Sequence, residues 1–305
     1  MHRIVSLLPS ATEIVCALGF QDQLVGRSHE CDFPAGVERL PSLTSPKFNP
    51  EGSSAEIDQR VRKILVDALA VYRVDADKLR ELRPGVIVTQ SQCDVCAVSM
   101  RDVEEAVAQW IGGPPLKIVS LAPYSLDDVF EDMKRVAAAL GAPERGDELV
   151  ARLRARMSDI ATRARAADSR PTVTCVEWID PLMAGGNWMP ELVAMAGGTN
   201  LFGEAGAHSP RLAFDDLAAA DPDAIVIAPC GFNMERAAID LPILARQPRW
   251  PRIKAVRDGR VYQADGNQYF NRPGPRIAES LEILSEILHP EIFHFGHEGS
   301  GWRRA

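Results

Sequence analysis

Short apolar runs alternate with amphipathic stretches along this chain. Residues 3–7 form the first apolar run, and residues 11–18 follow it at helical spacing. A strand that passes through a turn into a helix is typical of an α/β lobe, and Ser10 and Glu13 stand at the spacing of a capping box. Ligands of open α/β sheets gather where strands end and helices begin, so Pro9 and Ser10 are candidate ligand-binding residues.

The same alternation continues through the first half of the chain. Apolar runs predict strands at 24–27, 86–89 and 117–121, and amphipathic stretches predict helices at 55–70, 77–82 and 100–110. Ser53 and Glu56 have capping-box spacing before the first of these helices. Strands that alternate with helices in this way predict a parallel sheet with helices on both faces.

Two helices in the middle of the chain separate this pattern from a second one. A helix at 125–140 ends before Gly141, and another follows at 142–167. At 1.5 Å per residue the second helix is roughly 35 Å long, which is enough to join two domains. The alternation then resumes, with strands expected at 172–178, 224–228 and 260–264 and helices at 190–196, 214–219, 234–246 and 275–288.

These patterns predict an α/β fold of two Rossmann-like lobes, each with a parallel sheet, joined by one long helix. We expect an N-terminal lobe over 1–124, connecting helices over 125–169 and a C-terminal lobe over 170–289, with the ligand cleft between the lobes. Residues 290–305 show no period, and we expect an irregular or frayed tail. A length of 305 residues fits two domains of ordinary size.

Composition and charge exclude several classes of protein. With 46% hydrophobic and 25% charged residues, the chain indicates neither disorder nor membrane insertion. A net charge of -8 argues against binding to nucleic acid, which needs clustered Lys and Arg. The arginine-dense stretch 152–165 alternates with apolar residues at helical spacing, and we interpret it as a solvated helix face.

The start of the chain and its cysteines bear on the compartment. The first residues lead into a strand rather than into the apolar core of a secretory signal. Six scattered cysteines look like reduced thiols rather than a disulfide framework. We therefore expect a cytoplasmic protein, with a periplasmic or other extracytoplasmic location as the alternative if the native signal is missing.

Four stretches carry a resemblance to a known family. They are RIVSLLPSATEIVCALG at 3–19, VGRSHECDFP at 25–34, ELRPGVIVTQ at 81–90 and VYQADGNQYFNRPGPRIAESLEIL at 261–284. In this order they resemble the helix-linked solute-binding proteins that serve ABC importers of iron-siderophores, cobalamin and metal ions, and most of all the cobalamin-binding branch. The resemblance implies a corrinoid ligand, no catalysis and, if the protein is exported, an importer permease as partner.

Metal-ligating side chains follow two strands of the N-terminal lobe. His29, Glu30 and Cys31 follow the second strand, and Cys93 and Cys96 follow the fourth, with Gln92 beside them. If these strands are neighbours, their loops open onto the same edge of the sheet. Thiolate and imidazole suit zinc or another thiophilic metal, and imidazole also suits the cobalt of a corrin. His29, Cys31, Cys93 and Cys96 are therefore a candidate metal site. The candidate ligand-binding residues of these loops are His29, Glu30, Cys31, Gln92 and Cys93.

Two other interpretations of these residues remain open. Free cysteines are commonly buried as small hydrophobic residues, and His29 is then an ordinary loop residue. Alternatively, Cys93 and Cys96 form a redox dithiol near the start of a helix, where the dipole stabilises a thiolate.

Aromatic and polar residues cluster after strands of the C-terminal lobe. Aromatic rings offer broad contact area to a large flat ligand, and Tyr and Trp keep a polar group. Core packing is the alternative for each ring. The candidate ligand-binding residues here are Glu177, Trp178, Trp188, Tyr269, Phe270, Asn271 and Arg272.

The sequence indicates a binding protein rather than an enzyme. It contains no Gly-x-Ser-x-Gly motif, no phosphate loop and no set of nucleophile and base at a recognisable spacing. We expect it to bind cobalamin or a related corrinoid. The alternatives are a metal-handling or thiol-dependent protein that uses the four-residue metal site, and a binder of siderophores or other metal chelates.

Overall fold

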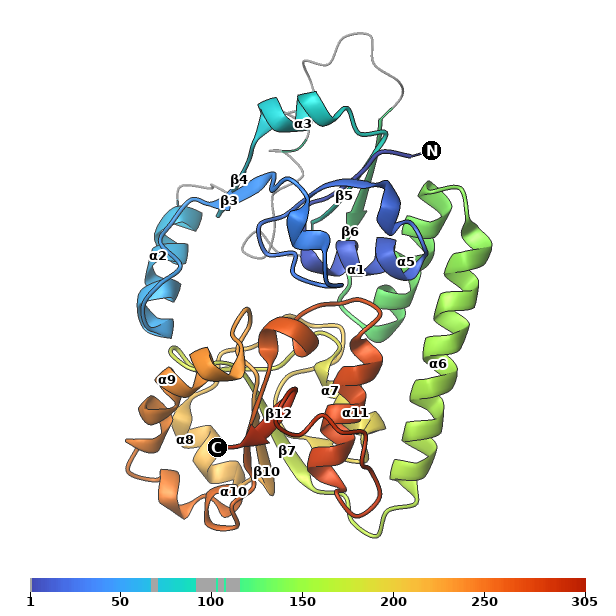
Figure 1. Ribbon diagram of the computed structural model, residues 1–305. Helices are drawn as coiled ribbons and strands as arrows, with labels where there is room; N and C mark the ends of the chain where they lie inside the picture. The colour runs from blue at the N-terminus through green and yellow to red at the C-terminus, as the bar shows by residue number, and fades with distance from the viewer. Residues whose placement is uncertain (1, 67–70, 92–102, 104–106, 108–115) are drawn as a thin grey trace. The chain divides into compact units, whose positions relative to one another are not determined.

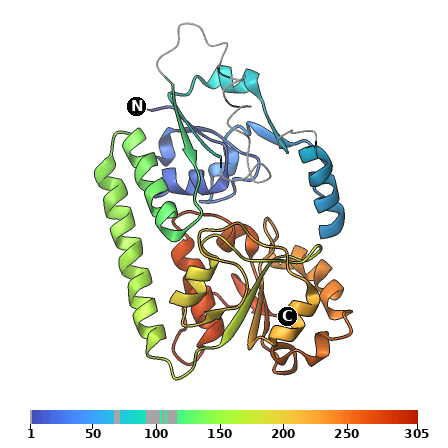
Figure 2. The same ribbon diagram turned by 180° about the vertical axis from the view of Figure 1, so that it is seen from behind.

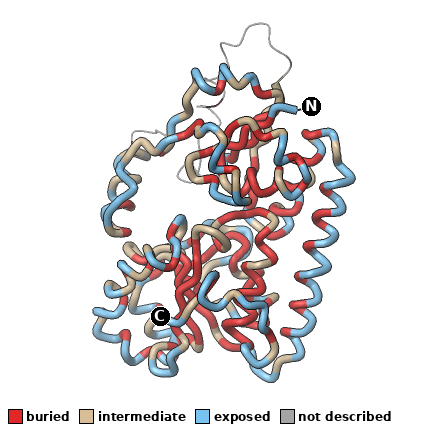
Figure 3. Tube along the Cα trace, in the orientation of Figure 1, coloured by how far each residue is buried: buried red, intermediate tan, exposed pale blue. Residues whose placement is uncertain are grey.

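The computed structural model describes residues 2–66, 71–91, 103, 107 and 116–305 (Figure 1). The chain forms two compact units. Unit 1 comprises Met1–Glu51, Gln59–Pro123 and Asp127–Arg152, and unit 2 comprises Gly52–Asp58, Tyr124–Leu126 and Leu153–Ala305. In each unit, buried strands lie at the centre and the outer faces of the helices are exposed (Figure 3).

The sheet of unit 1 is fully parallel, as predicted. It contains four strands in the order β2-β1-β5-β6, which are β1 (Ile4–Ser6), β2 (Leu24–Arg27), β5 (Val86–Gln90) and β6 (Lys117–Leu121). Every residue of β1 and β5 is buried, which fits their continuous apolar runs.

The order of these strands corrects one expectation. β2 and β5, which precede the two metal-ligating loops, are not neighbours, because β1 lies between them. Adjacent strands lie about 4.8 Å apart, so strands two positions apart are separated by roughly 10 Å. Both are parallel to β1, and so both end at the same edge of the sheet, as expected.

The first turns of α1 (Pro9–Ala17) and α2 (Ser54–Val66) test the two predicted capping boxes. α1 begins at its proline, with Leu8 as N-cap and no side-chain cap, so the box of Ser10 and Glu13 is wrong. Proline is favoured in the first turn because its missing N–H needs no partner there. The second box is confirmed before α2: Glu56 Oε2 accepts from Ser53 N at 2.8 Å, and Glu56 N donates to Ser53 Oγ at 3.3 Å.

A separate two-stranded sheet in unit 1 was missed by the sequence pattern. β3 (Thr44–Pro46) and β4 (Tyr72–Val74) pair antiparallel, and each has only three residues, too few to show a period. The other regular elements here are 3-10 turns at Gln21–Gln23 and Val37–Arg39 and the helices α3 (Ala76–Leu82) and α5 (Leu126–Ala139). Most of the helix expected at 100–110 lies outside the described residues.

The long helix is present, and its polar face is solvated. α6 (Pro143–Arg165) has 23 residues, and the boundary between the units falls between Arg152 and Leu153 (Figure 1). Its apolar side chains are buried at helical spacing, as at Leu149, Leu153 and Met157. The arginines between them are exposed, which confirms the expected solvated face.

The sheet of unit 2 is a separate sheet, again as predicted. Its parallel strands are β7 (Thr172–Trp178), β9 (Thr199–Asn200), β10 (Ala224–Ile227) and β11 (Val261–Ala264). Two short strands, β8 (Met183–Ala184) and β12 (Trp302–Arg304), pair antiparallel with β7 and β11. The sheet thus contains two antiparallel strands, β8 and β12, that the sequence pattern did not predict.

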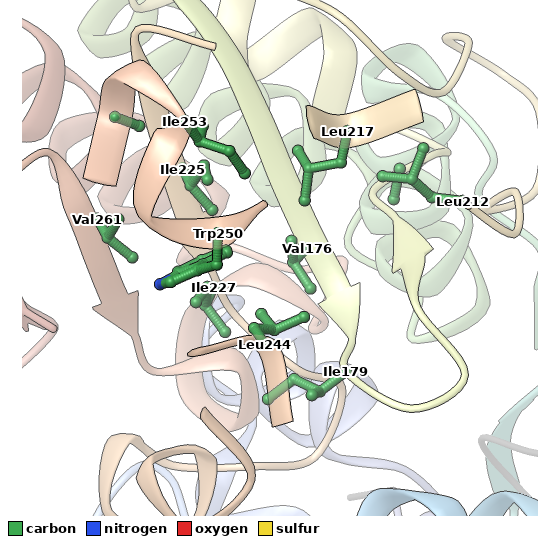
Figure 4. Close-up of a cluster of buried hydrophobic side chains, with 12 residues drawn as sticks. Val176, Ile179, Leu212, Leu217, Ile225, Ile227, Leu244, Trp250, Ile253 and Val261 are labelled. Atoms are coloured by element: carbon green, nitrogen blue, oxygen red, sulfur yellow. The ribbon is translucent and has the colours of Figure 1, made fainter. Parts of the chain in front are cut away.

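Helices cover both faces of the unit 2 sheet (Figures 1 and 2). α7 (Met189–Met195) and α11 (Ile277–Leu288) lie on one side, and α8 (Phe214–Ala220), α9 (Met234–Ala245) and α10 (Lys254–Arg257) lie on the other. A 3-10 turn at Trp250–Arg252 precedes α10. Leu217, Leu244 and Ile253 from the second side pack against strand residues such as Ile225 (Figure 4).

The end of the chain is anchored. Residues 290–301 are largely irregular, as expected, but β12 adds a strand to β11 instead of fraying. Trp302 is 7% exposed, and its Nε1 donates to Glu286 of α11 at 2.8 Å. A buried aromatic near the end of a chain holds that end in place, and the expectation of a frayed end is therefore wrong.

Candidate functional site

The loop after β2 holds His29 in a fixed orientation. The Thr44 hydroxyl donates to Ser28 Oγ at 3.0 Å, and His29 Nδ1 lies 2.7 Å from Thr44 Oγ1. The backbone N–H of His29 also donates to Thr44 Oγ1, at 3.0 Å, so this hydroxyl holds both the backbone and the ring of His29. The edge of the ring meets Tyr72 at 5.1 Å between centroids. Burial, and then the charge of Arg27, lower the pKa of His29, which favours the neutral imidazole.

Glu30 and Cys31 of the same loop contact neighbouring elements of unit 1. Tyr72 donates through its hydroxyl to Glu30 Oε1 at 2.8 Å, which ties the loop to β4. Cys31 is 2% exposed, and Thr12 Oγ1 of α1 donates to its sulfur at 3.1 Å. The thiol is therefore placed as a buried residue against the first helix.

The other predicted residues of unit 1 are divided between core and undescribed parts of the chain. Pro9 is half-buried in the first turn of α1, whereas Ser10 is buried and its Oγ has no hydrogen-bond partner in the described structure. Gln92, Cys93 and Cys96 lie outside the described residues. No group of three or more metal-ligating side chains occurs in the described parts of the chain, and the four-residue metal site stays a prediction.

In unit 2, the end of β7 carries a half-buried glutamate, Glu177, and an aromatic ring, Trp178. Ser209 Oγ donates to Glu177 Oε2 at 2.6 Å. Burial raises the pKa of Glu177 and outweighs the opposite effect of its hydrogen bonds with Ser209 and Gly186. The half-buried Trp178 donates from Nε1 to Asp180 O at 3.0 Å and packs against Phe232, with ring centroids 5.0 Å apart.

The loop after β11 is a tight turn that carries the half-buried ring of Tyr269. Asp265 accepts from Gln268 N at 2.7 Å at the start of a π-helical turn, Gly266–Phe270. Asn271 Nδ2 donates to Ala228 O and to Gly266 O, at 3.1 and 2.9 Å. These bonds join the carboxyl ends of β10 and β11, which are parallel neighbours of one sheet.

The predicted aromatic residues of unit 2 fall into two groups. Trp188 and Phe270 are 6% and 1% exposed, and Trp188 Nε1 donates to Phe270 O at 3.1 Å. The structure places this pair in the core, in agreement with the packing alternative. Trp178 and Tyr269 are half-buried and reach the surface at the carboxyl edge of the sheet.

Asn271 and Arg272, the polar residues of this loop, form hydrogen bonds within the protein. Arg272 is 4% exposed, and its Nη2 donates to Asn267 Oδ1 at 3.1 Å. Asn271 commits its amide to the two carbonyl groups described above. Arg272 is thus buried, whereas Asn271 is half-buried, and their role toward a ligand stays a prediction.

Sequence reasoning missed several residues that shape these loops. Phe232 follows β10 and packs on Trp178, and its place after a strand was a usable signal. Thr44, Tyr72 and Ser209 are distant in sequence from the residues that they hold, and no local pattern pointed to them.

Comparison with known proteins decides the family. Residues 4–267 match the family described as periplasmic binding protein. The chain belongs to this family. The match bears out the resemblance predicted from the sequence, and it assigns the chain to a class of solute-binding proteins rather than of enzymes.

Similar proteins cover nearly the whole chain at low identity. The uncharacterized ABC transporter substrate-binding lipoprotein YvrC of Bacillus subtilis is 24% identical over 297 residues, which are 95% of this chain and 81% of that protein. The vitamin B12-binding protein of Vibrio cholerae is 21% identical over 311 residues, which are 94% of this chain and 89% of that protein. The solved structure of a periplasmic heme-binding protein from Pseudomonas aeruginosa has a TM-score of 0.70 at 23% sequence identity. The match covers 95% of this chain and 94% of that protein.

These comparisons confirm the α/β fold and correct the expected location. The relatives are named as lipoproteins or periplasmic proteins, and they support the periplasmic alternative instead of the cytoplasmic prediction. Among the described residues, no helix is long and apolar enough to cross a membrane.

Proposed function

We propose that this periplasmic binding protein binds a cobalamin-like corrinoid. The observation that carries the proposal is the pair of half-buried aromatic residues, Trp178 and Tyr269, at the carboxyl edge of the unit 2 sheet. Aromatic rings supply large contact area at low cost in conformational entropy, which suits a broad macrocycle. The B12-binding relative supports this ligand, and the heme-binding neighbour makes iron porphyrin the competing one.

His29 of unit 1 carries a nitrogen of the kind that binds cobalt. Because Nδ1 of His29 is engaged by Thr44, Nε2 is the nitrogen left to bind cobalt. A neutral imidazole with its other nitrogen hydrogen-bonded is the usual form of a histidine ligand. Binding replaces the water on cobalt by Nε2 and involves no change of oxidation state. The exposed ring of Phe33 in the same loop offers further apolar contact.

Delivery to an importer follows from the same proposal. A solute-binding protein of this family, once exported, hands its ligand to the permease of an ABC importer. Zinc or another thiophilic metal at His29, Cys31, Cys93 and Cys96 is the alternative cargo, and metal analysis of the purified protein tests it.

Titration calorimetry with aquocobinamide tests the proposed ligand. We expect a dissociation constant in the micromolar range or below and a shift of the visible bands as Nε2 replaces water. His29→Ala should abolish the band shift, and Trp178→Ala should weaken binding by about tenfold through lost contact area. His294→Ala, at an exposed histidine of the tail, is the matched control and should behave as wild type. Binding of haemin or a ferric chelate with no response to corrinoids would contradict the proposal.

A further inference from the structure

The C-terminal tail, residues 290–305, is held by one buried carboxylate of α11. Glu286 is 5% exposed. Its Oε1 accepts from Gly296 N at 2.6 Å, and its Oε2 accepts from His297 N at 3.2 Å and from Trp302 Nε1 at 2.8 Å. A carboxylate with several donors fixes the groups around it, because losing any partner leaves a buried charge less satisfied. The tail therefore has a defined path across α11.

This path brings the tail against the loop that carries Tyr269. Asp265 N, at the start of the loop, donates to Gly301 O of the tail at 2.9 Å. The rings of His297 and Tyr269 pack in a T-shaped arrangement, with centroids 6.1 Å apart and planes at 68°. The guanidinium of Arg276 lies over the Tyr269 ring at 5.2 Å. The tail thus contacts both the backbone and the aromatic ring of this loop.

His297 is itself held by a chain of charged groups. Its Nε2 lies 2.9 Å from Glu282 Oε2, and Arg156 of α6 lies 2.7 Å from Glu282 Oε1. The side chains of His297 and Glu282 are 16% and 7% exposed, so water screens this pair only weakly. The orientation of the imidazole, and with it the packing of its ring against Tyr269, depends on this hydrogen bond.

We propose that His297 is a positioning residue for Tyr269, and that the tail thereby couples the shape of the unit 2 site to the charge on one imidazole. The consequence for ligand affinity rests on the proposed function. The positioning of Tyr269 itself does not, because it is a property of the free protein.

The charges around His297 set the direction of the pH dependence. The hydrogen bond to Glu282 raises the pKa of His297 above its ordinary 6.5 against the opposing effect of burial, and the charges of Glu282, Glu286 and Glu279 raise it further. Arg156 is the cation that faces the same cluster, through Glu282. The raised pKa favours the imidazolium, and the ion pair is lost as the pH rises through that pKa. Tyr269 should be held most firmly below that pH.

NMR of protein with ¹³C-labelled tyrosine rings tests the positioning directly. The chain has four tyrosines, and Tyr269→Phe assigns the signal of interest. In the free protein, the Tyr269 signal should titrate with an apparent pKa above 6.5. His297→Gln, which keeps a side-chain donor but no titratable group, should remove this titration, whereas His294→Ala should leave it intact. A Tyr269 signal that titrates identically in wild type and His297→Gln, or does not titrate in wild type, would overturn the inference.

The pH dependence of ligand affinity is the second measurement. With aquocobinamide, wild-type affinity should fall about three- to tenfold as the pH rises through the same pKa, the range expected for loss of one aromatic contact. His297→Gln should give a flat profile at the weaker affinity. If no corrinoid binds at any pH while the Tyr269 signal still titrates, the proposed function fails and the positioning role stands.

Discussion

Gly266 occupies a place at the carboxyl edge of the unit 2 sheet that no side chain fits. A Cβ atom added there would lie 2.1 Å from Pro229 O and 2.7 Å from the carbonyl carbon of Ala228. Both are backbone atoms of the residues that follow β10, and they cannot rotate away as a flexible side chain does. The close approach lets Asn271 bond to Ala228 O and Gly266 O together. The lack of a side chain at Gly266 thus allows the Tyr269 loop to pack against the residues after β10.

Gly266→Ala should accordingly destabilise the protein and displace the loop. We expect a loss of about 2 kcal/mol in the free energy of unfolding, in the range of overpacked cores, measured by urea denaturation. Gly85→Ala is the matched control: its Cβ meets nothing within 4 Å, and the change should stay within about 0.5 kcal/mol. Equal stability of Gly266→Ala and wild type would show that the two strand ends are not packed as described.

At the scale of elements, the start of α2 is docked on α9 within unit 2. Asp240 of α9, 2% exposed, accepts from Ser54 N at 2.9 Å and pairs with Arg236 at 3.2 Å. Arg236 also donates to Gly52 O and lies over the ring of Phe232 at 4.1 Å. Phe232 packs on Trp178, so the docked segment 52–58 is connected by contacts to the candidate site.

Asp240→Ala should release this segment. The change removes the acceptor of Ser54 N and the carboxylate partner of Arg236, and we expect a loss of about 3 kcal/mol in the free energy of unfolding. Amide hydrogen exchange of residues 52–58 should also speed up. Glu235→Ala on the same helix removes only an exposed pair with Arg303 at 3.3 Å and should cost less than about 1 kcal/mol. Unchanged exchange in Asp240→Ala would refute the docking.

The long elements were predictable because their patterns are local. β6 and β7 begin and end where the apolar runs do, and α6 shows its apolar stripe in the sequence. β3, β8 and β12 have three residues or fewer, too few for a period, and pairing partners far along the chain decide them. For the same reason the order of β2, β1 and β5 could not be read from the sequence.

The candidate site was predicted only in part. The strand-end loops were located correctly, because parallel strands bring their carboxyl ends to one edge of a sheet. The burial of each side chain was not predictable. The sequence pattern does not distinguish Trp178 from Trp188, yet Trp178 is half-buried and Trp188 packs in the core against Phe270. Such differences arise from tertiary contacts that the local pattern does not contain.

At the scale of the whole molecule, each unit has its own sheet and its own hydrophobic core. A ligand that binds only the folded protein stabilises it by mass action, by about 2.7 kcal/mol at 100 times its dissociation constant. The proposed function therefore predicts a stabilised protein with a bound macrocycle. The choice among macrocycles depends on which one this chain selects when several are present.

A competition experiment tests that choice most directly. The protein is mixed with equal excesses of aquocobalamin, aquocobinamide and haemin, separated from free ligand, and its absorbance spectrum is recorded. The account predicts the visible bands of a corrinoid at a ratio of about one per chain. A haem Soret band, or a protein that emerges without any macrocycle, would contradict it.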